Sequence, residues 1–317
     1  GDIDVEQTKV WIDKYFGGIP ARPMPEVATP VATLPSIVRL FHEDNFARVP
    51  ELRLVWPTVP IYDDDSYALE ILASLLTQGK QTPFYKVIVE EEELAPSPWG
   101  YSSQAELAGV FTLQVRTDEG IDLDAAFDGV TKAFERFEEG VPSSEMERVK
   151  ARYETQFYGR RLSSVFEKAL KLAEYNILTP TPGYFAEELE RTLAVTVDDV
   201  MRVYDLYIKD RPYVATSFVP RGAPELTLEG SERADVVVEP VVQGAEAEFT
   251  RQRGTERTPP AGSLDRSVEP AFGAPPTLTA PTVARRTLGN GLEVLVIEDH
   301  EVPIVQFTLR WRCGHLL

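Results

Sequence analysis

The spacing of apolar residues changes along the chain in an order that limits the possible folds. Residues 36–44 and 51–60 have the composition of strands, whereas from residue 68 the apolar positions recur at intervals of three and four, as in a helix. Further strands are predicted at 100–106, 110–116 and 213–220, and further helices at 4–16, 83–93, 123–137, 144–157, 164–175, 184–193 and 197–208. Because the strands come in adjacent pairs, we expect an α+β fold in which helices cover one face of a two-layer antiparallel sheet.

Short polar motifs predict where several helices begin. The aspartates at positions 63–65 suit a helix N-terminus, where carboxylates face unpaired N–H groups. The pairs Ser144 with Glu147 and Thr196 with Asp199 fit capping boxes. The apolar stripes that follow such starts predict a set of core residues: Ile71, Leu72, Leu75, Phe127, Val130, Phe134, Val200 and Tyr204.

Changes in composition divide the chain into four predicted parts. Residues 1–35 are a helix followed by a proline-rich connector that leaves a preceding domain, and residues 36–220 are the α+β domain. Residues 221–282 are rich in Gly, Pro, Ala, Glu, Thr and Arg, which indicates a linker. Within it, the stretch ADVVVEPVV is compatible with a strand. Residues 283–317 are predicted to form a β-hairpin that opens a new unit.

The hairpin prediction depends on the dipeptide Asn290-Gly291, a strong turn signal. Two strand-like runs follow it, at 292–298 and 302–312. In the second run the apolar residues occupy alternate positions and predict one buried face: Val305, Phe307, Leu309 and Trp311. Since a lone hairpin is marginal in water, we expect this one either to dock on the α+β domain or to self-associate with a second chain.

The composition excludes several classes of function. The net charge of -19 disfavours binding to nucleic acid phosphates. No apolar run is long enough to span a membrane, and the first residues lack the basic start and apolar stretch of a signal peptide. We expect the parent protein to be periplasmic or otherwise exported. Its export signal would therefore lie elsewhere. A single cysteine, Cys313, rules out a disulfide within the chain.

Candidate catalytic and metal-binding residues are sparse. The histidines His42, His300 and His315 are scattered, and no H-E-x-x-H or H-x-x-E-H motif is present. Cys313 has no evident base partner. Four consecutive glutamates at positions 90–93 would point around a helix rather than at one cation, so a solvated face is the favoured interpretation. We therefore predict no catalytic residue, no metal ligand and no cofactor in this chain.

Five strings, in order, resemble patterns of the peptidase M16 family, the insulinase or pitrilysin type of zinc metalloprotease. They are GDIDVEQTKVWIDKYFGGIPARP, PFYKVIVEEEELA, GVPSSEMERVKARYETQF, PGYFAEELERTLAVTVDDVMRVYDLYI and RTLGNGLEVLVIEDHEVPIVQFTLRWRCGHLL. The fourth string is the most specific of them. Together the five strings are spread along the chain on both sides of the linker, and each is weak alone.

The resemblance implies that the chain is a piece of a longer, clam-shell protease. It would carry the second half of one M16 unit, the linker and the first hairpin of the next unit. The zinc, the zinc-bearing half, the second M16 unit and the bound peptide substrate would then belong to the parent. Many family members hold the substrate backbone with an arginine and a tyrosine, and the matching positions here are Val89 and Pro96. Neither can replace those contacts, because Val has no donor and Pro lacks even a backbone N–H.

Three function hypotheses remain open at this point. The leading one is a non-catalytic domain of a zinc metalloendopeptidase, itself inactive, which would wall the chamber. A second is an M16-like scaffold or assembly subunit that has lost its zinc site, and the missing Arg and Tyr fit this equally well. A third is an independent peptide-binding module, which the unfinished hairpin disfavours. An intact zinc motif elsewhere in the parent would separate the first hypothesis from the second.

Overall fold

The computed structural model describes residues 3–21, 23, 33–162, 164–236, 268, 280–300 and 303–311. The chain divides into two units, Gly1–Ala28 with Val237–Glu301, and Thr29–Val236 with Val302–Leu317. The domain boundaries expected from composition stay a prediction. Among the described residues, no helix combines the length and the apolar character that a membrane span requires.

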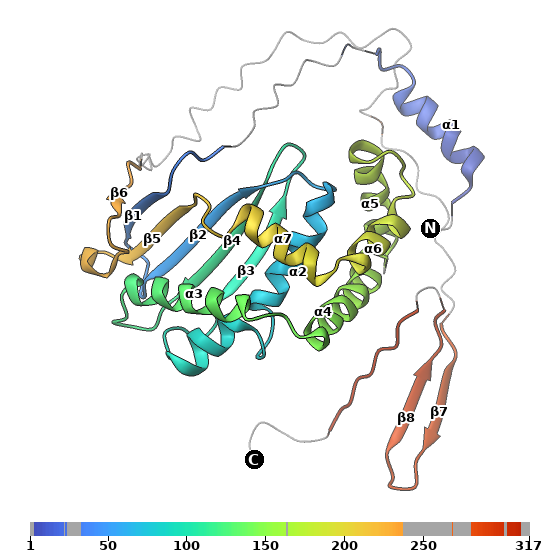
Figure 1. Ribbon diagram of the computed structural model, residues 1–317. Coiled ribbons are helices and arrows are strands. Elements are labelled where there is room, and N and C mark those ends of the chain that lie inside the picture. The colour runs from blue at the N-terminus through green and yellow to red at the C-terminus, as the bar shows by residue number, and fades with distance from the viewer. Residues whose placement is uncertain are drawn as a thin grey trace. The chain divides into compact units, whose positions relative to one another are not determined.

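The larger unit contains a six-stranded sheet in the order β3-β4-β2-β5-β1-β6 (Figure 1). Its strands are β1 (Val38–Asp44), β2 (Glu51–Thr58), β3 (Trp99–Gln104), β4 (Gly109–Arg116), β5 (Val214–Pro220) and β6 (Glu232–Arg233). The pairs β2 with β4, β2 with β5, and β3 with β4 are antiparallel. The strand β1 instead runs parallel to β5 and β6. The predicted α+β class is thus confirmed. The sheet is mixed and not purely antiparallel, because β5 lies between β1 and β2 and runs parallel to β1.

Helices pack on one face of this sheet. They are α2 (Asp64–Thr77), α3 (Leu123–Glu138), α4 (Ser143–Gln156), α5 (Val165–Leu178), α6 (Phe185–Ala194) and α7 (Val197–Tyr207), with π-helices η1 (Tyr85–Glu91) and η2 (Phe157–Arg161) and a short 3-10 helix η3 (Pro224–Leu226). In β2 the alternate residues Leu52, Leu54 and Trp56 are buried, whereas Arg53 and Val55 are partly buried. This alternation gives the sheet one face that packs against the helices.

Six of the eight predicted core residues are buried: Ile71, Leu72, Leu75, Val130, Val200 and Tyr204. Phe127 and Phe134 are only partly buried and pack against the core cluster. Their position on α3 leaves one side of each ring facing a cavity, which is described below.

The predicted helix starts are mostly confirmed. Asp63 caps α2, and Thr196 with Asp199 forms a capping box at α7. The predicted box of Ser144 and Glu147 is wrong. Helix α4 begins at Ser143 after Pro142, and no side chain caps it. Pro142 is the N-cap residue, with an extended backbone, and its side chain has no oxygen that could accept a hydrogen bond from the first N–H groups of the helix.

The smaller unit contains α1 (Val5–Phe16) and a hairpin of β7 (Val283–Thr287) and β8 (Glu293–Ile297). The predicted C-terminal hairpin is confirmed, but its strands lie on either side of Asn290-Gly291, with Thr287 opposite Glu293. Gly291 has φ 85, which suits the turn. Residues 303–311, predicted as the second strand, have no regular secondary structure. The tight turn at Asn290-Gly291 pairs the residues just before it with those just after it. The partner of β8 is therefore the earlier segment Val283–Thr287 and not residues 303–311. The ADVVVEPVV segment lies mostly outside the described residues.

Gly109 at the start of β4 allows a close approach of two backbones. A Cβ atom built on this residue would lie 2.3 Å from the carbonyl oxygen of Val59. We expect Gly109→Ala to lower the free energy of unfolding by about 1–3 kcal/mol, because the sheet must shift to admit the methyl group. Urea denaturation measures this change. Gly159→Ala is the control, since its Cβ would meet no atom within 4 Å, and equal effects of the two substitutions would contradict the prediction.

Candidate functional site

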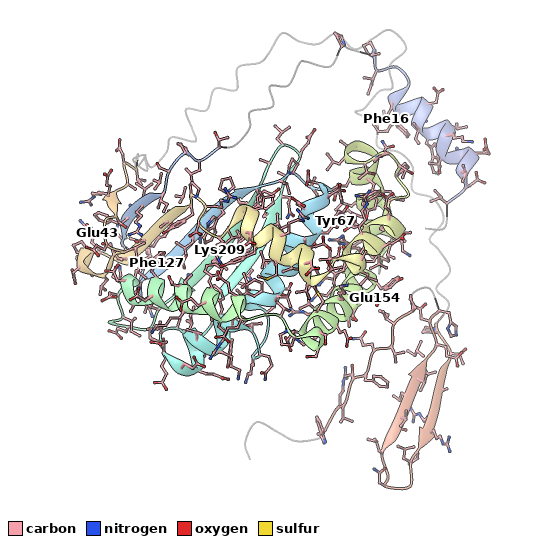
Figure 2. All side chains as sticks on the ribbon, in the orientation of Figure 1. Phe16, Glu43, Tyr67, Phe127, Glu154 and Lys209 are labelled. Atoms are coloured by element: carbon pink, nitrogen blue, oxygen red, sulfur yellow. The ribbon has the colours of Figure 1, made fainter. Side chains whose placement is uncertain are left out.

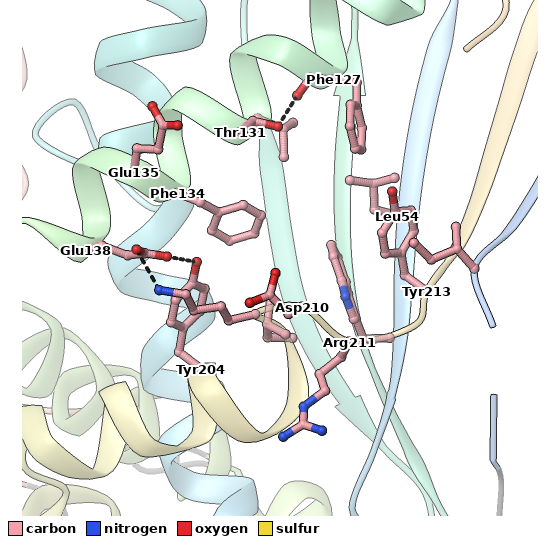
Figure 3. A pocket seen from close by; sticks show the side chains of 15 residues that line it. Leu54, Phe127, Thr131, Phe134, Glu135, Glu138, Tyr204, Asp210, Arg211 and Tyr213 are labelled. Atoms are coloured by element: carbon pink, nitrogen blue, oxygen red, sulfur yellow. Dashed lines mark hydrogen bonds and ion pairs between the residues drawn. The ribbon is translucent and has the colours of Figure 1, made fainter. Parts of the chain in front are cut away.

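An apolar pocket of about 440 Å³ lies where α3 and α7 meet the sheet (Figure 3). Leu54 and Trp56 reach it from β2 because their side chains point to the helix-covered face. Helix α3 contributes residues one turn apart, and the other walls come from the end of α7 and the segment before β5. The wall residues are Leu54, Trp56, Phe127, Val130, Phe134, Tyr204, Ile208 and Tyr213.

Aromatic rings form most of the pocket wall. The ring centroids of Trp56 and Tyr213 are 5.4 Å apart, and those of Phe134 and Tyr204 are 5.5 Å apart. Trp56 also meets Phe134 edge-on at 6.3 Å. Trp56 is 3% exposed, and its Nε1 is buried without a hydrogen-bond partner among the described residues. This donor is enclosed by the surrounding protein atoms and is not exposed to the open pocket.

Charged side chains surround the mouth of this pocket. Glu138 accepts hydrogen bonds of 2.8 Å from the Tyr204 hydroxyl and 2.8 Å from Lys209 Nζ. The Lys209 hydrogen bond lowers the pKa of Glu138, whereas burial raises the pKa of Tyr204 well above its usual value and Glu138 raises it further. Glu135, Asp210 and Arg211 also line the opening. Figure 3 shows a dashed line that joins Glu138 to Tyr204 at one end of the pocket, and Figure 2 shows where Lys209 lies on the ribbon.

A second feature is a buried ionic cluster around Glu188 of α6, which is 4% exposed. Its carboxylate is ion-paired with Arg161 and accepts hydrogen bonds from the hydroxyls of Tyr175 and Tyr153, the latter at 3.2 Å. These partners come from three different helices, so one carboxylate ties η2, α5 and α4 to α6. Burying a carboxylate requires partners of this kind.

Residues of the same cluster, Arg161 and Glu188, also line a polar cavity of about 290 Å³. Lys171 of α5 contacts Glu174 at 2.5 Å and the Tyr62 hydroxyl at 2.8 Å. Glu70 of α2 lines this cavity, and desolvation raises the pKa of its carboxyl, although Arg161 and Lys171 oppose the shift. Burial lowers the pKa of Lys171. The arrangement is one of mutually compensating charges.

Across the described residues, no group of three or more His, Cys, Asp or Glu side chains could hold a metal ion.

The individual candidates from the sequence occupy different segments of the chain. Val89 is partly buried in η1, and Pro96 is exposed in the loop that follows. His42 is partly buried in β1, and its ring meets Phe218 at 6.4 Å. His300 is exposed, with Nε2 3.7 Å from Glu298. His315 and Cys313 lie outside the described residues.

The glutamates at positions 90–93 are all exposed, as a solvated face requires, and three of them have basic partners. Glu90 pairs with Lys86 within η1, at 2.6 Å. Glu91 and Glu92 reach across to α3, where they pair with Arg136 at 2.6 Å and Lys132 at 2.7 Å. The carboxylates do diverge, as predicted, and three of them are paired with basic side chains. Such exposed pairs contribute little to stability.

A comparison with known protein families gives a match for the first half of the chain. Residues 1–153 match the family model described as the peptidase M16 inactive domain. Residues 1–153 therefore belong to the peptidase M16 family. The M16 match contains α1, the first four strands, α2, η1, α3 and most of α4. The aromatic residues of β2 and α3 that line the apolar pocket thus belong to the matched M16 region. No curated protein matches the chain.

Solved structures share the M16 fold of this chain. A protease from Helicobacter pylori superposes with a TM-score of 0.60 at 19% identity, covering 69% of this chain and 53% of that one. The peptidase M16 inactive domain from Pseudomonas fluorescens gives 0.54 at 15%, covering 69% and 52%. The periplasmic protease PqqL from Escherichia coli gives 0.59 at 18%, covering 94% and 34%. The chain therefore spans about half or less of the length of these proteins.

Proposed function

We propose that this M16 domain is a non-catalytic domain of a larger zinc metalloendopeptidase. The observation that carries the proposal is the match of residues 1–153 to a domain described as inactive. The likeness in fold to chains named as proteases supports it. In the parent, this domain would form part of the chamber wall around a peptide. Its partners would be the zinc-bearing half and a second M16 unit.

The zinc of such a parent would be held outside the residues described here. A catalytic zinc site takes three protein ligands and leaves one position open for water. The described residues offer no group of that kind, so they do not fit the metal, and no catalytic step is assigned to them. The replacement of the family Arg and Tyr by Val89 and Pro96 also fits a supporting role.

A scaffold role is the second candidate, and one structural likeness favours it. A chain of Complex III2 from Candida albicans shares the fold with a TM-score of 0.57 at 18% identity, covering 69% of this chain and 53% of that one. The fold alone is therefore compatible with a role in a large assembly. Self-association through the β7–β8 hairpin stays a prediction, and light scattering before and after deletion of residues 283–317 measures it.

We expect the 317-residue chain to bind no stoichiometric zinc and to show no chelator-sensitive cleavage of an unstructured peptide. The reason is the scattered placement of His42, His300 and His315 in the sequence. Elemental analysis of the dialysed chain provides the measurement, with the complete parent protein as the control. One zinc per chain would refute the prediction for this domain. A parent that lacks both zinc and activity would favour the scaffold role.

A further inference from the structure

A basic cavity of about 670 Å³ lies on the face of the sheet that is turned away from the helices. Leu52 of β2 points to the helices, so its neighbours Glu51 and Arg53 point to the other face. On the strands beside β2, Arg116 of β4 and Phe218 of β5 stand directly opposite Glu51. The register of three strands therefore gathers two arginines, one carboxylate and one aromatic ring in the wall of this cavity.

Glu51 holds the two strand arginines in place. Its Oε1 accepts a hydrogen bond from Arg53 Nη2 at 3.0 Å, and its Oε2 accepts two from Arg116, from Nε at 3.1 Å and from Nη2 at 2.6 Å. The side chain of Glu51 is 9% exposed, whereas those of Arg53 and Arg116 are 40% and 64% exposed. One carboxylate thus orients two exposed guanidinium groups and cancels only one of their two positive charges.

A third arginine, Arg48, lines the cavity from the loop between β1 and β2. It is exposed, and it has no hydrogen bond or ion pair with another described residue. Asp44 is the remaining charged residue of the wall, and it accepts a 2.6 Å hydrogen bond from the backbone N–H of Phe46. The wall therefore has three arginines and two carboxylates in a chain whose net charge is -19.

This excess of one positive charge distinguishes the basic cavity from the two sites described above. Carboxylates outnumber basic side chains in the apolar pocket, and the two are equal in the polar cavity. Guanidinium groups bind planar carboxylates through parallel N–H···O bonds. A carboxylate also matches the single excess charge, whereas a phosphate dianion would add repulsion from Asp44.

The basic cavity also has an apolar side, formed by Phe46, Val49 and Phe218. Phe46 is 92% exposed, so its ring is almost entirely in water. A simple anion such as acetate would leave this surface uncovered, whereas an organic acid with a ring would bury part of it.

We propose that the basic cavity binds an organic carboxylate, with the carboxylate paired to Arg48 and Arg116 and an apolar group against Phe46 and Phe218. The proposal goes beyond the function proposed above and does not depend on it, because it concerns only residues of this sheet and the adjoining loop. A protease domain and a scaffold would carry the same cavity. Free organic acids and peptide C-termini share this chemistry, and the ligands below distinguish them.

Matched ligands test the carboxylate by calorimetric titration of the whole chain. N-acetylphenylalanine ends as a peptide does, 3-phenylpropanoate is a free acid with the same ring, and N-acetylphenylalaninamide is neutral. We expect the acids to bind at least about tenfold more tightly than the amide, as charge-assisted hydrogen bonds contribute. Tighter binding of N-acetylphenylalanine than of 3-phenylpropanoate would assign a peptide C-terminus, and the reverse would assign a free acid. Equal binding of acids and amide, or no saturable binding, would overturn the proposal.

Two further ligands test the apolar side and the choice of anion. Acetate has the carboxylate without the ring and should bind more weakly than both acids. Phenyl phosphate has a ring and a second negative charge and should also bind more weakly. Acetate or phenyl phosphate that binds as tightly as the acids would contradict the assignment of an organic carboxylate.

Arg48→Gln tests the site within the protein. Because Arg48 has no partner among the described residues, we expect the variant to fold as the wild type does and to bind the acids about five- to tenfold more weakly, with the amide unchanged. Arg152→Gln is the matched control, since Arg152 of α4 is also exposed and does not line the basic cavity. An Arg48→Gln chain that binds the acids as the Arg152→Gln chain does would refute the assignment.

Discussion

Replacement of Leu72 by alanine is expected to lower the free energy of unfolding by about 2–5 kcal/mol. Leu72 is 0% exposed and lies on the face of α2 that packs into the main core cluster. The substitution removes buried methyl groups and leaves a cavity that close-packed neighbours fill only in part. Urea denaturation followed by circular dichroism measures the change.

Leu170→Ala is the matched control for this experiment. The same atoms are removed from a helix, but Leu170 on α5 is 54% exposed, so the loss should stay within about 0.5 kcal/mol. A Leu72→Ala protein as stable as the Leu170→Ala protein would mean that the inner face of α2 is misassigned.

The second large effect is expected at the ionic cluster. Glu188→Gln should cost about 1–3 kcal/mol, because it removes the negative charge that pairs with the partly buried side chain of Arg161, which is 31% exposed. The amide keeps the shape of the carboxylate and an acceptor for one tyrosine hydroxyl, so the loss comes mainly from the unpaired guanidinium. Helices α5 and α6, which Glu188 joins through Tyr175, should show the largest increase in amide hydrogen exchange.

Glu187→Gln supplies a neighbouring control. Glu187 pairs with Arg191 on the surface, with side chains 46% and 40% exposed, and such pairs contribute at most about 1 kcal/mol. If the two substitutions cost the same, Glu188 is compensated by solvent and not by its partners, and the cluster does not tie the helices together.

The sequence predicted most of the fold because its signals are local. The strand-like composition of β2, the stripe of α2 and the capping box at Thr196 each depend on residues a few positions apart. The direction of β1 could not be predicted in this way. It depends on residues beyond 213, and nothing within Val38–Asp44 distinguishes a parallel from an antiparallel neighbour.

The two candidate sites could not be predicted from the sequence, for a related physical reason. The residues of the polar cavity come from separate segments, and each by itself resembles an ordinary surface residue of a helix or loop. They are Tyr62, Glu70, Arg161, Lys171 and Glu188. Likewise, Phe127 and Phe134 were predicted as core from their spacing, which cannot reveal that the space beside a ring is empty. Only the packing of α3 against α7 creates that space.

The pairing of β1 has a consequence for how the domain is made. Both strands that flank β1 come late in the chain, since Val38 pairs with Val214 and Leu40 pairs with Glu232. During synthesis, β1 therefore leaves the ribosome long before either partner exists, and both of its edges stay open until residues 214–233 follow. Contacts this distant in sequence form slowly, and open strand edges attract other chains. Nascent chains that stall before residue 214 should be the ones that chaperones bind most strongly.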